Sequence, residues 1–378
     1  ITFLFLIIKK IKIANILNFN FLIIMSSLVL FYTINHRAEF SFGYQPLQGG
    51  MDGLLNEGYA REIYTNFLNF NFYEFFRGGE NIYYFMPGLR YILAIEKFLF
   101  GDNHFLIYLS IIFLPITFFV FLKKINFTNN ISLIIVFLFI FLQIPHLGFS
   151  YQHYIKGGLS IYSETTAIFC FFITIILLTN KKFFCSGLIC SILVILRPNY
   201  FPAYFILILY NMIIFIKNKE QDNLKFIYGA LFILLMPLHN LFYGNEFVFF
   251  VNGSGISRLT MAPSEYLNVL SNQEVYNKLT FQLKNLLSTG QHNILVYIVN
   301  GILLCNLLIY LIRKIKNILK LKLDINLLIA TIALAQLLPL LFFANTGRYA
   351  FFAWLLVTIL NLITIKDYFV KKRYKYTI

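Results

Sequence analysis

Apolar runs of about 18 residues or more recur along the chain, and this repetition limits the possible folds more than any other feature. A helix needs a run of that length to cross a hydrocarbon core about 30 Å thick. Hydrophobic residues make up 59% of the 378 residues and charged residues 12%, whereas soluble chains carry about 25% charged residues. The sequence therefore predicts an all-α polytopic membrane protein in which residues 1–378 form a single integral membrane domain.

Ten transmembrane helices are predicted from the apolar windows. Apart from Glu164, Arg197 and Lys217 at their ends, they contain no Asp, Glu, Lys or Arg. Ion-coupled transporters usually keep ionisable residues at mid-membrane, so that class of protein is disfavoured. Two long connections, 35–103 and 244–291, separate some of the spans. The predicted spans are residues 13–34, 104–122, 131–149, 164–180, 183–197, 200–217, 226–243, 292–312, 325–344 and 349–365.

The distribution of charge predicts the orientation of these spans. With the N-terminus inside, the inner segments hold 20 of the 31 Lys and Arg, and the outer segments hold 12 of the 16 acids. This is the positive-inside pattern, and it accounts for the net charge of +15 without a nucleic-acid partner. We expect both termini in the cytoplasm of a plasma (inner) membrane. Both long connections would then face the periplasm or exterior, or the lumen in a eukaryote.

The first long connection, 35–103, carries most of the outer ionisable groups. The apolar spacing predicts a helix from Gly53 to about Phe70, with Asp52 in the N-cap position just before it. Pro87 is expected to open a second helix, 87–100. We expect a helical, partly re-entrant loop whose second helix rests on the membrane surface, because it carries Arg90, Glu96 and Lys97. An amphipathic segment is also expected around Ser264–Leu287 in the second long connection.

The layout of this loop resembles a known superfamily. The loop opens with Asp52, or with Asn56-Glu57, ahead of Tyr59-Ala60, and it closes on the aromatic-proline segment Tyr83–Leu89. An inner N-terminus, one span and such a loop resemble the GT-C superfamily of membrane glycosyltransferases, which includes protein mannosyltransferases and lipid A aminoarabinose transferases. The resemblance implies an early acid as the catalytic residue. It also implies inverting transfer of a sugar from a polyprenyl-phosphate donor to a lipid, glycan or protein acceptor at the outer face.

Three acids are candidates for the catalytic carboxylates. Transfer from a lipid phosphate needs a base for the acceptor hydroxyl, and Asp52 is either that base or only a helix cap. Glu57 is a second candidate, although its spacing also fits an i,i+4 ion pair with Arg61. Glu80 is either a turn residue or a second carboxylate that holds the acceptor or a divalent metal (Mg or Mn). No metal-ligand spacing occurs in the sequence, so no cofactor is certain.

Arginines at the predicted outer face are candidates for holding the departing phosphate. Arg90, Arg197 and Arg348 either bind that phosphate or extend towards lipid headgroups. Tyr84 and Tyr349 stand beside these segments and are candidate substrate contacts. The stretch Tyr151–Glu164 adds contacts for the sugar or acceptor, namely His153, Lys156 and Glu164.

Other interpretations stay open. A polysaccharide polymerase or ligase also has many spans and a long outer loop with arginines, although that loop normally lies late in the chain. A non-enzymatic glycolipid carrier or flippase would need a polar cavity among the spans. His146 and His239 lie near outer span ends, where we expect hydrogen-bonded structural histidines rather than catalytic ones. The expected surroundings in every case are membrane lipids.

Overall fold

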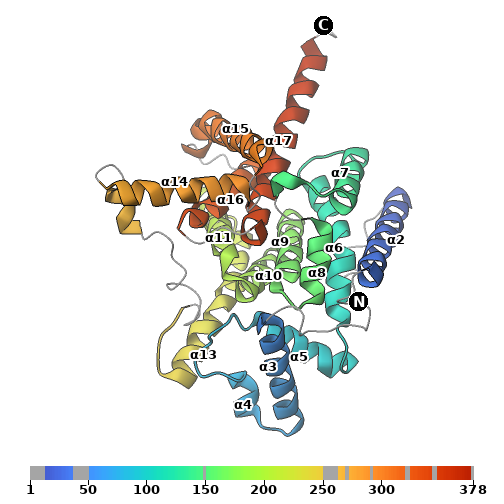
Figure 1. Ribbon diagram of the computed structural model, residues 1–378, viewed down its shortest axis with the longest axis vertical. Coiled ribbons are helices and arrows are strands. Elements are labelled where there is room, and N and C mark those ends of the chain that lie inside the picture. Colours follow the sequence, from blue (N-terminus) through green and yellow to red (C-terminus); the bar gives the residue numbers. More distant parts are fainter. Residues whose placement is uncertain are drawn as a thin grey trace.

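The computed structural model describes residues 13–36, 51–147, 150–249, 263–268, 272–289, 293–319, 324–342 and 347–375. The regular elements within these residues are all helices (Figure 1). The first six α-helices are α2 (Ile13–His36), α3 (Met51–Leu68), α4 (Phe72–Arg77), α5 (Gly88–Phe100), α6 (Phe105–Lys124) and α7 (Asn129–Phe141). The others are α8 (Tyr151–Leu159), α9 (Ser163–Thr179), α10 (Phe183–Leu196), α11 (Phe201–Asn218), α12 (Asp222–Ala230), α13 (Leu235–Gly244), α14 (Gln273–Ser288), α15 (Ile294–Leu319), α16 (Ile325–Leu337) and α17 (Gly347–Lys375).

Among the described residues, six helical segments are long and apolar enough to cross a membrane, so the chain is an all-α membrane protein. They coincide with six of the ten predicted spans. The segments α12 and α13 together form one of them, joined by a short 3-10 turn at Leu231–Leu234. The six are Leu17–His36, Phe105–Lys124, Pro198–Asn218, Asp222–Gly244, Ile294–Asn317 and Ala350–Tyr368.

The other four predicted spans form helices of 17 residues or fewer. The predicted span 131–149 ends early because α7 has 13 residues and Leu142 already has extended backbone. Pro145 follows closely, and a proline disfavours helical backbone in the residue before it. The helix α10 has 14 residues, and α16 with the 3-10 turn after it covers Ile325–Leu341. Helices this short do not by themselves reach across about 30 Å of hydrocarbon at 1.5 Å per residue.

The fourth short span, predicted at 164–180, is α9, and it continues from α8 through a sharp bend. The two helices are bent by 118°, which makes them either a broken span or a re-entrant loop. Counting this pair as one span gives up to seven. Among the described residues the sharp bend therefore lies at 159–163, whereas a re-entrant element was predicted in 35–103.

The centre of the bundle is formed where α10 packs against α9 and α12. Glycines allow the backbones of α10 and α12 to approach closely. A Cβ built on Gly187 would lie 1.9 Å from the carbonyl oxygen of Phe226, and one on Gly229 would lie 2.2 Å from that of Phe184. Ser191 on α10 donates to the backbone oxygens of Gly229 and Ala230. A larger residue at either glycine would force the two helices apart.

Connections that are rich in lysine meet at one end of the bundle. Lys124 at the end of α6 donates to Asn180, which follows α9. Lys366 on α17 donates to the backbone oxygen of Asn126, 2.7 Å away, in the turn after α6. These segments were all predicted to lie on one side of the membrane, and the contacts place their ends together.

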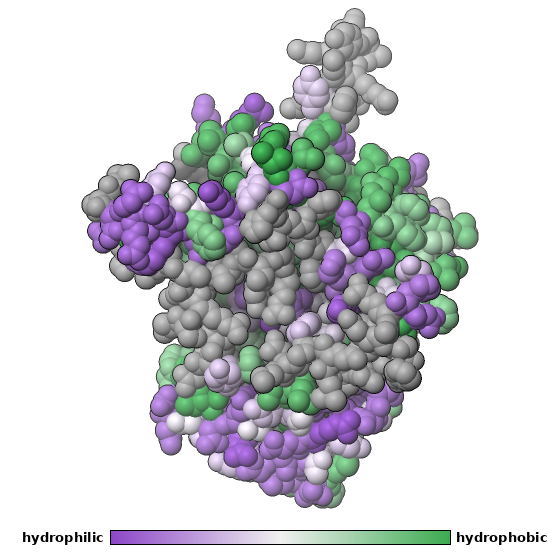
Figure 2. All heavy atoms as spheres, viewed as in Figure 1, coloured by the Kyte–Doolittle hydropathy of each residue, from purple (hydrophilic) through white to green (hydrophobic). Residues whose placement is uncertain are grey.

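Helices α3, α4 and α5 lie together at the lower end of the molecule in Figure 1, away from the C-terminal end of α17. Figure 2 shows that this lower end is largely hydrophilic on the face viewed, whereas apolar residues dominate the surface over α7. A contact with α10 ties this group to the bundle, because a Cβ on Gly88 would lie 2.8 Å from the backbone of Ile195. The described helices of the first long connection, α3 to α5, thus form a subdomain seated on one end of the bundle.

The charged residues of α5 are buried, although they were the reason for predicting that this helix rests on the membrane surface. Arg90, Glu96 and Lys97 are 0%, 0% and 4% exposed. The exposed residues of α5 are apolar, among them Phe98 and Leu99. The reason is that each buried charge meets a partner on α3, on the loop before α5 or at the start of α6, as described next.

Candidate functional site

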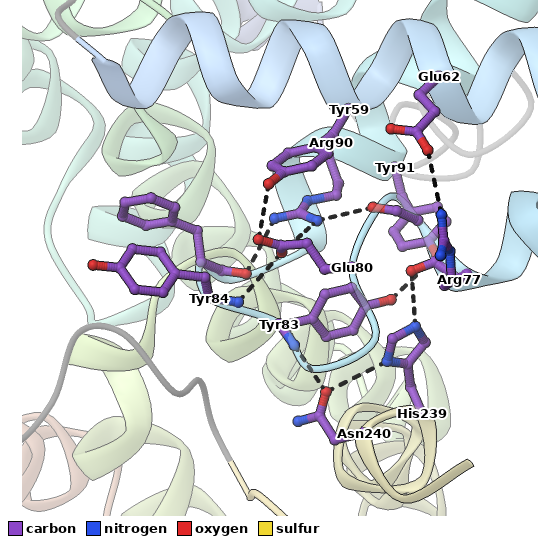
Figure 3. Close-up of polar contacts among 12 residues, drawn as sticks. Tyr59, Glu62, Arg77, Glu80, Tyr83, Tyr84, Arg90, Tyr91, His239 and Asn240 are labelled. Atoms are coloured by element: carbon purple, nitrogen blue, oxygen red, sulfur yellow. Dashed lines mark hydrogen bonds and ion pairs between the residues drawn. The ribbon is translucent and has the colours of Figure 1, made fainter. Parts of the chain in front are cut away.

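The guanidinium of Arg90 joins α5 to α3 and to the loop between α4 and α5 (Figure 3). Its Nη1 lies 2.8 Å from Oε2 of Glu80, and its centre lies 3.9 Å from the centroid of the Tyr59 ring. Arg90 also donates to the backbone oxygen of Gly78 at 2.9 Å. The Tyr59 hydroxyl donates to the other oxygen of Glu80 at 2.9 Å, and burial raises the pKa of this tyrosine. Both oxygens of Glu80 are therefore occupied.

The loop carrying Glu80 takes its shape from two glycines with left-handed backbone. Gly78 has φ +63° and ends α4, and Gly79 has φ +86°. A Cβ on Gly79 would lie 2.4 Å from the Tyr59 ring, so only glycine fits there without movement. The two glycines turn the chain so that Glu80 points at Arg90.

The same loop is tied to α13, which lies far away in the sequence. The Tyr83 ring stacks on the His239 ring with centroids 3.9 Å apart, and Tyr83 N donates to Asn240 Oδ1 at 3.1 Å. Asn240 Nδ2 donates to the backbone oxygen of Val248 at 2.9 Å, and His239 Nε2 bonds to the oxygen of Arg77 at 3.0 Å. This confirms the structural interpretation of His239. His146 likewise bonds to Thr358 at 3.0 Å.

The hydroxyl of Tyr83 extends the connection to α5. It lies 3.2 Å from the hydroxyl of Tyr91, which donates to the backbone oxygen of Phe76 at 2.8 Å. Burial raises the pKa of both tyrosines, so both remain neutral hydrogen-bonding groups at physiological pH. The segment 76–91 is thereby held as one rigid unit.

Glu57 belongs to a second ion-pair group on the other side of α3. Its Oε1 lies 2.9 Å from Arg61 and 2.6 Å from the buried Lys97, and its Oε2 has no partner among the described residues. The predicted i,i+4 pair with Arg61 is confirmed. Asp102 completes the group at 2.7 Å from Lys97, and this ammonium, followed by Arg61, lowers the pKa of Asp102. Glu57 therefore joins α3 to α5 electrostatically.

Glu96 has a different role, which the sequence did not indicate. Its carboxylate accepts from the backbone N–H of Leu106, in the first turn of α6, and so caps that membrane span. Burial raises the pKa of Glu96 to about 7 in spite of this bond. The side chain thus fastens the end of α5 to the start of α6.

Glu164 in the first turn of α9 and Arg197 directly after α10 form an ion pair. They are 33 residues apart in the sequence and lie at the ends of two different predicted spans. Tyr200 follows Arg197, and its ring lies 4.7 Å from that of Phe352 on α17. The ring of Tyr154 on α8 lies 5.1 Å from that of Phe351. The N-terminal part of α17 therefore packs against Tyr154 and Tyr200, close to the Glu164–Arg197 pair, and the backbone of Arg348 and Tyr349 belongs to its first turn.

The charged subdomain α3–α5 and the Glu164–Arg197 pair lie at the same end of the bundle. Gly88, two residues before Arg90, packs on the backbone of Ile195, two residues before Arg197. The subdomain α3–α5 therefore lies beside the Glu164–Arg197 pair. The candidate site is therefore the end of the bundle where this subdomain and this ion pair meet.

The predicted site residues fall into three sets. Glu57, Glu80, Arg90, Glu164 and Arg197 are engaged in ion pairs, so in this arrangement their charges are already balanced. His153 is exposed on α8 with Nδ1 2.8 Å from the hydroxyl of Ser150; Lys156 is half-buried on the same helix, and Tyr84 is 51% exposed. The side chains of Asp52, Arg348 and Tyr349 lie outside the described residues.

The backbone at Asp52 corrects one prediction. The helix α3 begins at Met51, so Asp52 is its second residue rather than the N-cap residue before Gly53. A carboxylate in the first turn is still favoured by the helix dipole.

A divalent metal has no evident ligand set in the described part of the chain. No group of three or more His, Cys, Asp or Glu comes together there, and Glu80 is taken up by Arg90 and Tyr59. We therefore derive no step that involves a metal.

Several residues that build this end of the molecule were not predicted, notably Tyr59, Tyr83, Lys97 and Asn240. Tyr83 and Asn240 are 157 residues apart, so no local pattern in the sequence links them. Lys97 was noted only as a surface charge.

Comparison of the chain with protein-family models, with curated protein sequences and with solved structures found no match.

Proposed function

We propose that the chain is a membrane glycosyltransferase that moves a sugar from a polyprenyl-phosphate donor to an acceptor at the outer face of a plasma membrane. One observation carries the proposal: the acid- and arginine-bearing subdomain α3–α5 is seated on the same bundle end as the Glu164–Arg197 pair and the first turn of α17. The layout of the first loop, which resembles the GT-C superfamily, supports the same conclusion. So does the gathering of lysine-rich ends elsewhere in the bundle.

The roles within the reaction follow from which charges are already paired. Glu57 and Glu80 are held by Lys97 and Arg90, which leaves Asp52 in the first turn of α3 as the proposed base. The acceptor hydroxyl gives its proton to the Asp52 carboxylate as its oxygen bonds to the anomeric carbon. The bond from that carbon to the phosphate oxygen breaks, and the polyprenyl phosphate leaves with the electron pair.

The departing phosphate needs positive charge at the membrane surface. We assign this to Arg348 in the first turn of α17, because Arg197 already has Glu164 as a partner and Arg90 has Glu80. His153 and Lys156 on α8 are assigned to the sugar or the acceptor. The proposal also retains up to ten membrane passages, with the short helices α7, α10 and α16 embedded among the longer ones.

The experiment is product analysis in membranes that contain the chain. Membranes are supplied with a panel of polyprenyl-phosphate sugars, and the products are read by mass spectrometry. Appearance of free polyprenyl phosphate and of acceptors carrying one added sugar supports the proposal. A ladder of lengthening glycans would instead indicate a polymerase, and donor binding without turnover a carrier. Arg348→Gln should weaken donor use, whereas Lys284→Gln on α14 should not.

A further inference from the structure

Helix α5 is amphipathic in the opposite sense from a helix that lies on a soluble protein. Its buried side carries Arg90, Glu96 and Lys97, and its outer side carries Ile95, Phe98, Leu99 and Phe100, which are 43–60% exposed. Soluble proteins bury such residues and expose the charges. The outer side of α5 therefore requires an apolar neighbour that the described chain does not supply.

The exposed residues are continuous with a membrane span. The Phe100 ring lies 5.0 Å from that of Phe105, the first residue of α6, which is itself exposed. The centroid of the Phe98 ring lies 4.9 Å from that of the Phe67 ring on α3. Because α6 enters the membrane at Phe105, the last turns of α5 lie at the level where the hydrocarbon begins.

The charged side explains why α5 cannot simply rotate. Glu96 caps α6, Lys97 holds Glu57 and Asp102, and Arg90 holds Glu80. These bonds come from three different segments and fix the orientation of the helix about its axis. The apolar side of α5 is thus held outward by the structure itself.

We propose that the outer side of α5, defined by Ile95, Phe98, Leu99 and Phe100, is inserted into the boundary between headgroups and acyl chains of the outer leaflet. The occupant is phospholipid, because the surface runs directly into the lipid-facing start of α6. Aromatic side chains are favoured at that depth. Insertion holds Arg90 and the loop 78–86, on the opposite side of α5, just above the membrane surface.

The test uses the fact that the chain has a single tryptophan, Trp354, which is buried. The full chain carrying Phe98→Trp is placed in nanodiscs made with phospholipids brominated close to the headgroup. Bromine quenches tryptophan over short distances, and iodide quenches it from water. Thr65→Trp serves as the matched control, since Thr65 is exposed on α3 two residues beyond the buried Ile63. The unsubstituted chain gives the Trp354 background.

Phe98→Trp should lose most of its added emission in brominated lipid and be insensitive to iodide, and Thr65→Trp should behave in the reverse way. Leu99→Trp should match Phe98→Trp, and it provides the same readout if Phe98→Trp fails to fold. The proposal is overturned if both α5 variants are quenched by iodide as strongly as the control. It is also overturned if they resist both quenchers, because a second copy or another protein then covers the helix.

Discussion

The guanidinium of Arg90 lies 2.8 Å from the carboxylate of Glu80, and this buried pair holds the subdomain α3–α5 together. Arg90 comes from α5 and Glu80 from the loop before it, which also contacts α3 and α13. Removing one partner of a buried pair leaves an uncompensated charge and costs about 3–5 kcal/mol. The pair is therefore the first place to test the structure.

Arg90→Met should lower the thermal unfolding temperature strongly, because Glu80 would lose its buried counter-ion. Arg61 provides a matched comparison: it also pairs with acids, Glu57 on α3 and Asp102 after α5, but its side chain is 57% exposed. Arg61→Met should cost about 1 kcal/mol or less. Unfolding followed by thermal denaturation in detergent checks both variants. Equal effects would show that Arg90 is not buried as described.

Gly79→Ala should destabilise the protein by more than about 1 kcal/mol, because φ is +86° and the new methyl group meets the Tyr59 ring. Gly58→Ala on α3 is its control. A Cβ there has no neighbour within 4 Å, and alanine is favoured in a helix by about 0.5–1 kcal/mol. The two substitutions should therefore shift the unfolding temperature in opposite directions. A stabilising Gly79→Ala would contradict the left-handed turn.

Glu96 should make stability depend on pH. Its pKa of about 7 in the folded protein lies above the ordinary value of 4.5, so the fold favours the neutral form. The contribution of Glu96 is fully present below about pH 4.5 and is lost as pH rises through 7. Glu96→Gln keeps an oxygen for the Leu106 N–H and removes the titration.

The measurement for Glu96 is the difference in unfolding free energy between the parent and Glu96→Gln across this pH range. That difference should change by up to about 1.4 kcal/mol per pH unit in favour of the variant as pH rises. Glu246→Gln, at an exposed position of the second loop, should follow the parent at every pH. If the unfolding free energies of the parent and of Glu96→Gln change with pH in parallel, Glu96 does not have a raised pKa in the folded protein.

Glu164 and Arg197 should be energetically coupled. Glu164→Gln and Arg197→Gln should each destabilise the protein, and the double variant should be less destabilised than the two effects added. A coupling energy of about 0.5–3 kcal/mol is typical for residues in contact. A double-mutant cycle by thermal unfolding measures it. Strict additivity would place the two side chains apart.

The sequence predicted the bounds of helices α3 and α5 to within a few residues. The segment from Gly53 to about Phe70 is α3 (Met51–Leu68), and 87–100 is α5 (Gly88–Phe100). Local rules were sufficient here because apolar spacing and Pro87 mark the ends of these helices. The pair Glu57–Arg61 was predicted for the same reason, since i,i+4 neighbours are set by helix geometry alone.

What the sequence could not predict depends on contacts between distant segments. The charged residues of α5 predict an exposed helix face, because their partners on α3 and α6 cannot be known from the local sequence. The stacking of Tyr83 on His239 joins segments more than 150 residues apart. The length of α7 also escaped prediction, because hydropathy measures apolar character and not where a helix stops.

The most direct test of the account is turnover by the purified chain in proteoliposomes containing a polyprenyl-phosphate sugar that the membrane assay has identified. The quantity measured is the release of free polyprenyl phosphate. The account predicts release by the parent and by Glu246→Gln, and its loss in Asp52→Asn although that variant inserts and unfolds like the parent. Undiminished release by Asp52→Asn would contradict the assignment of the base, and no release by the parent with any donor would contradict the proposed activity itself.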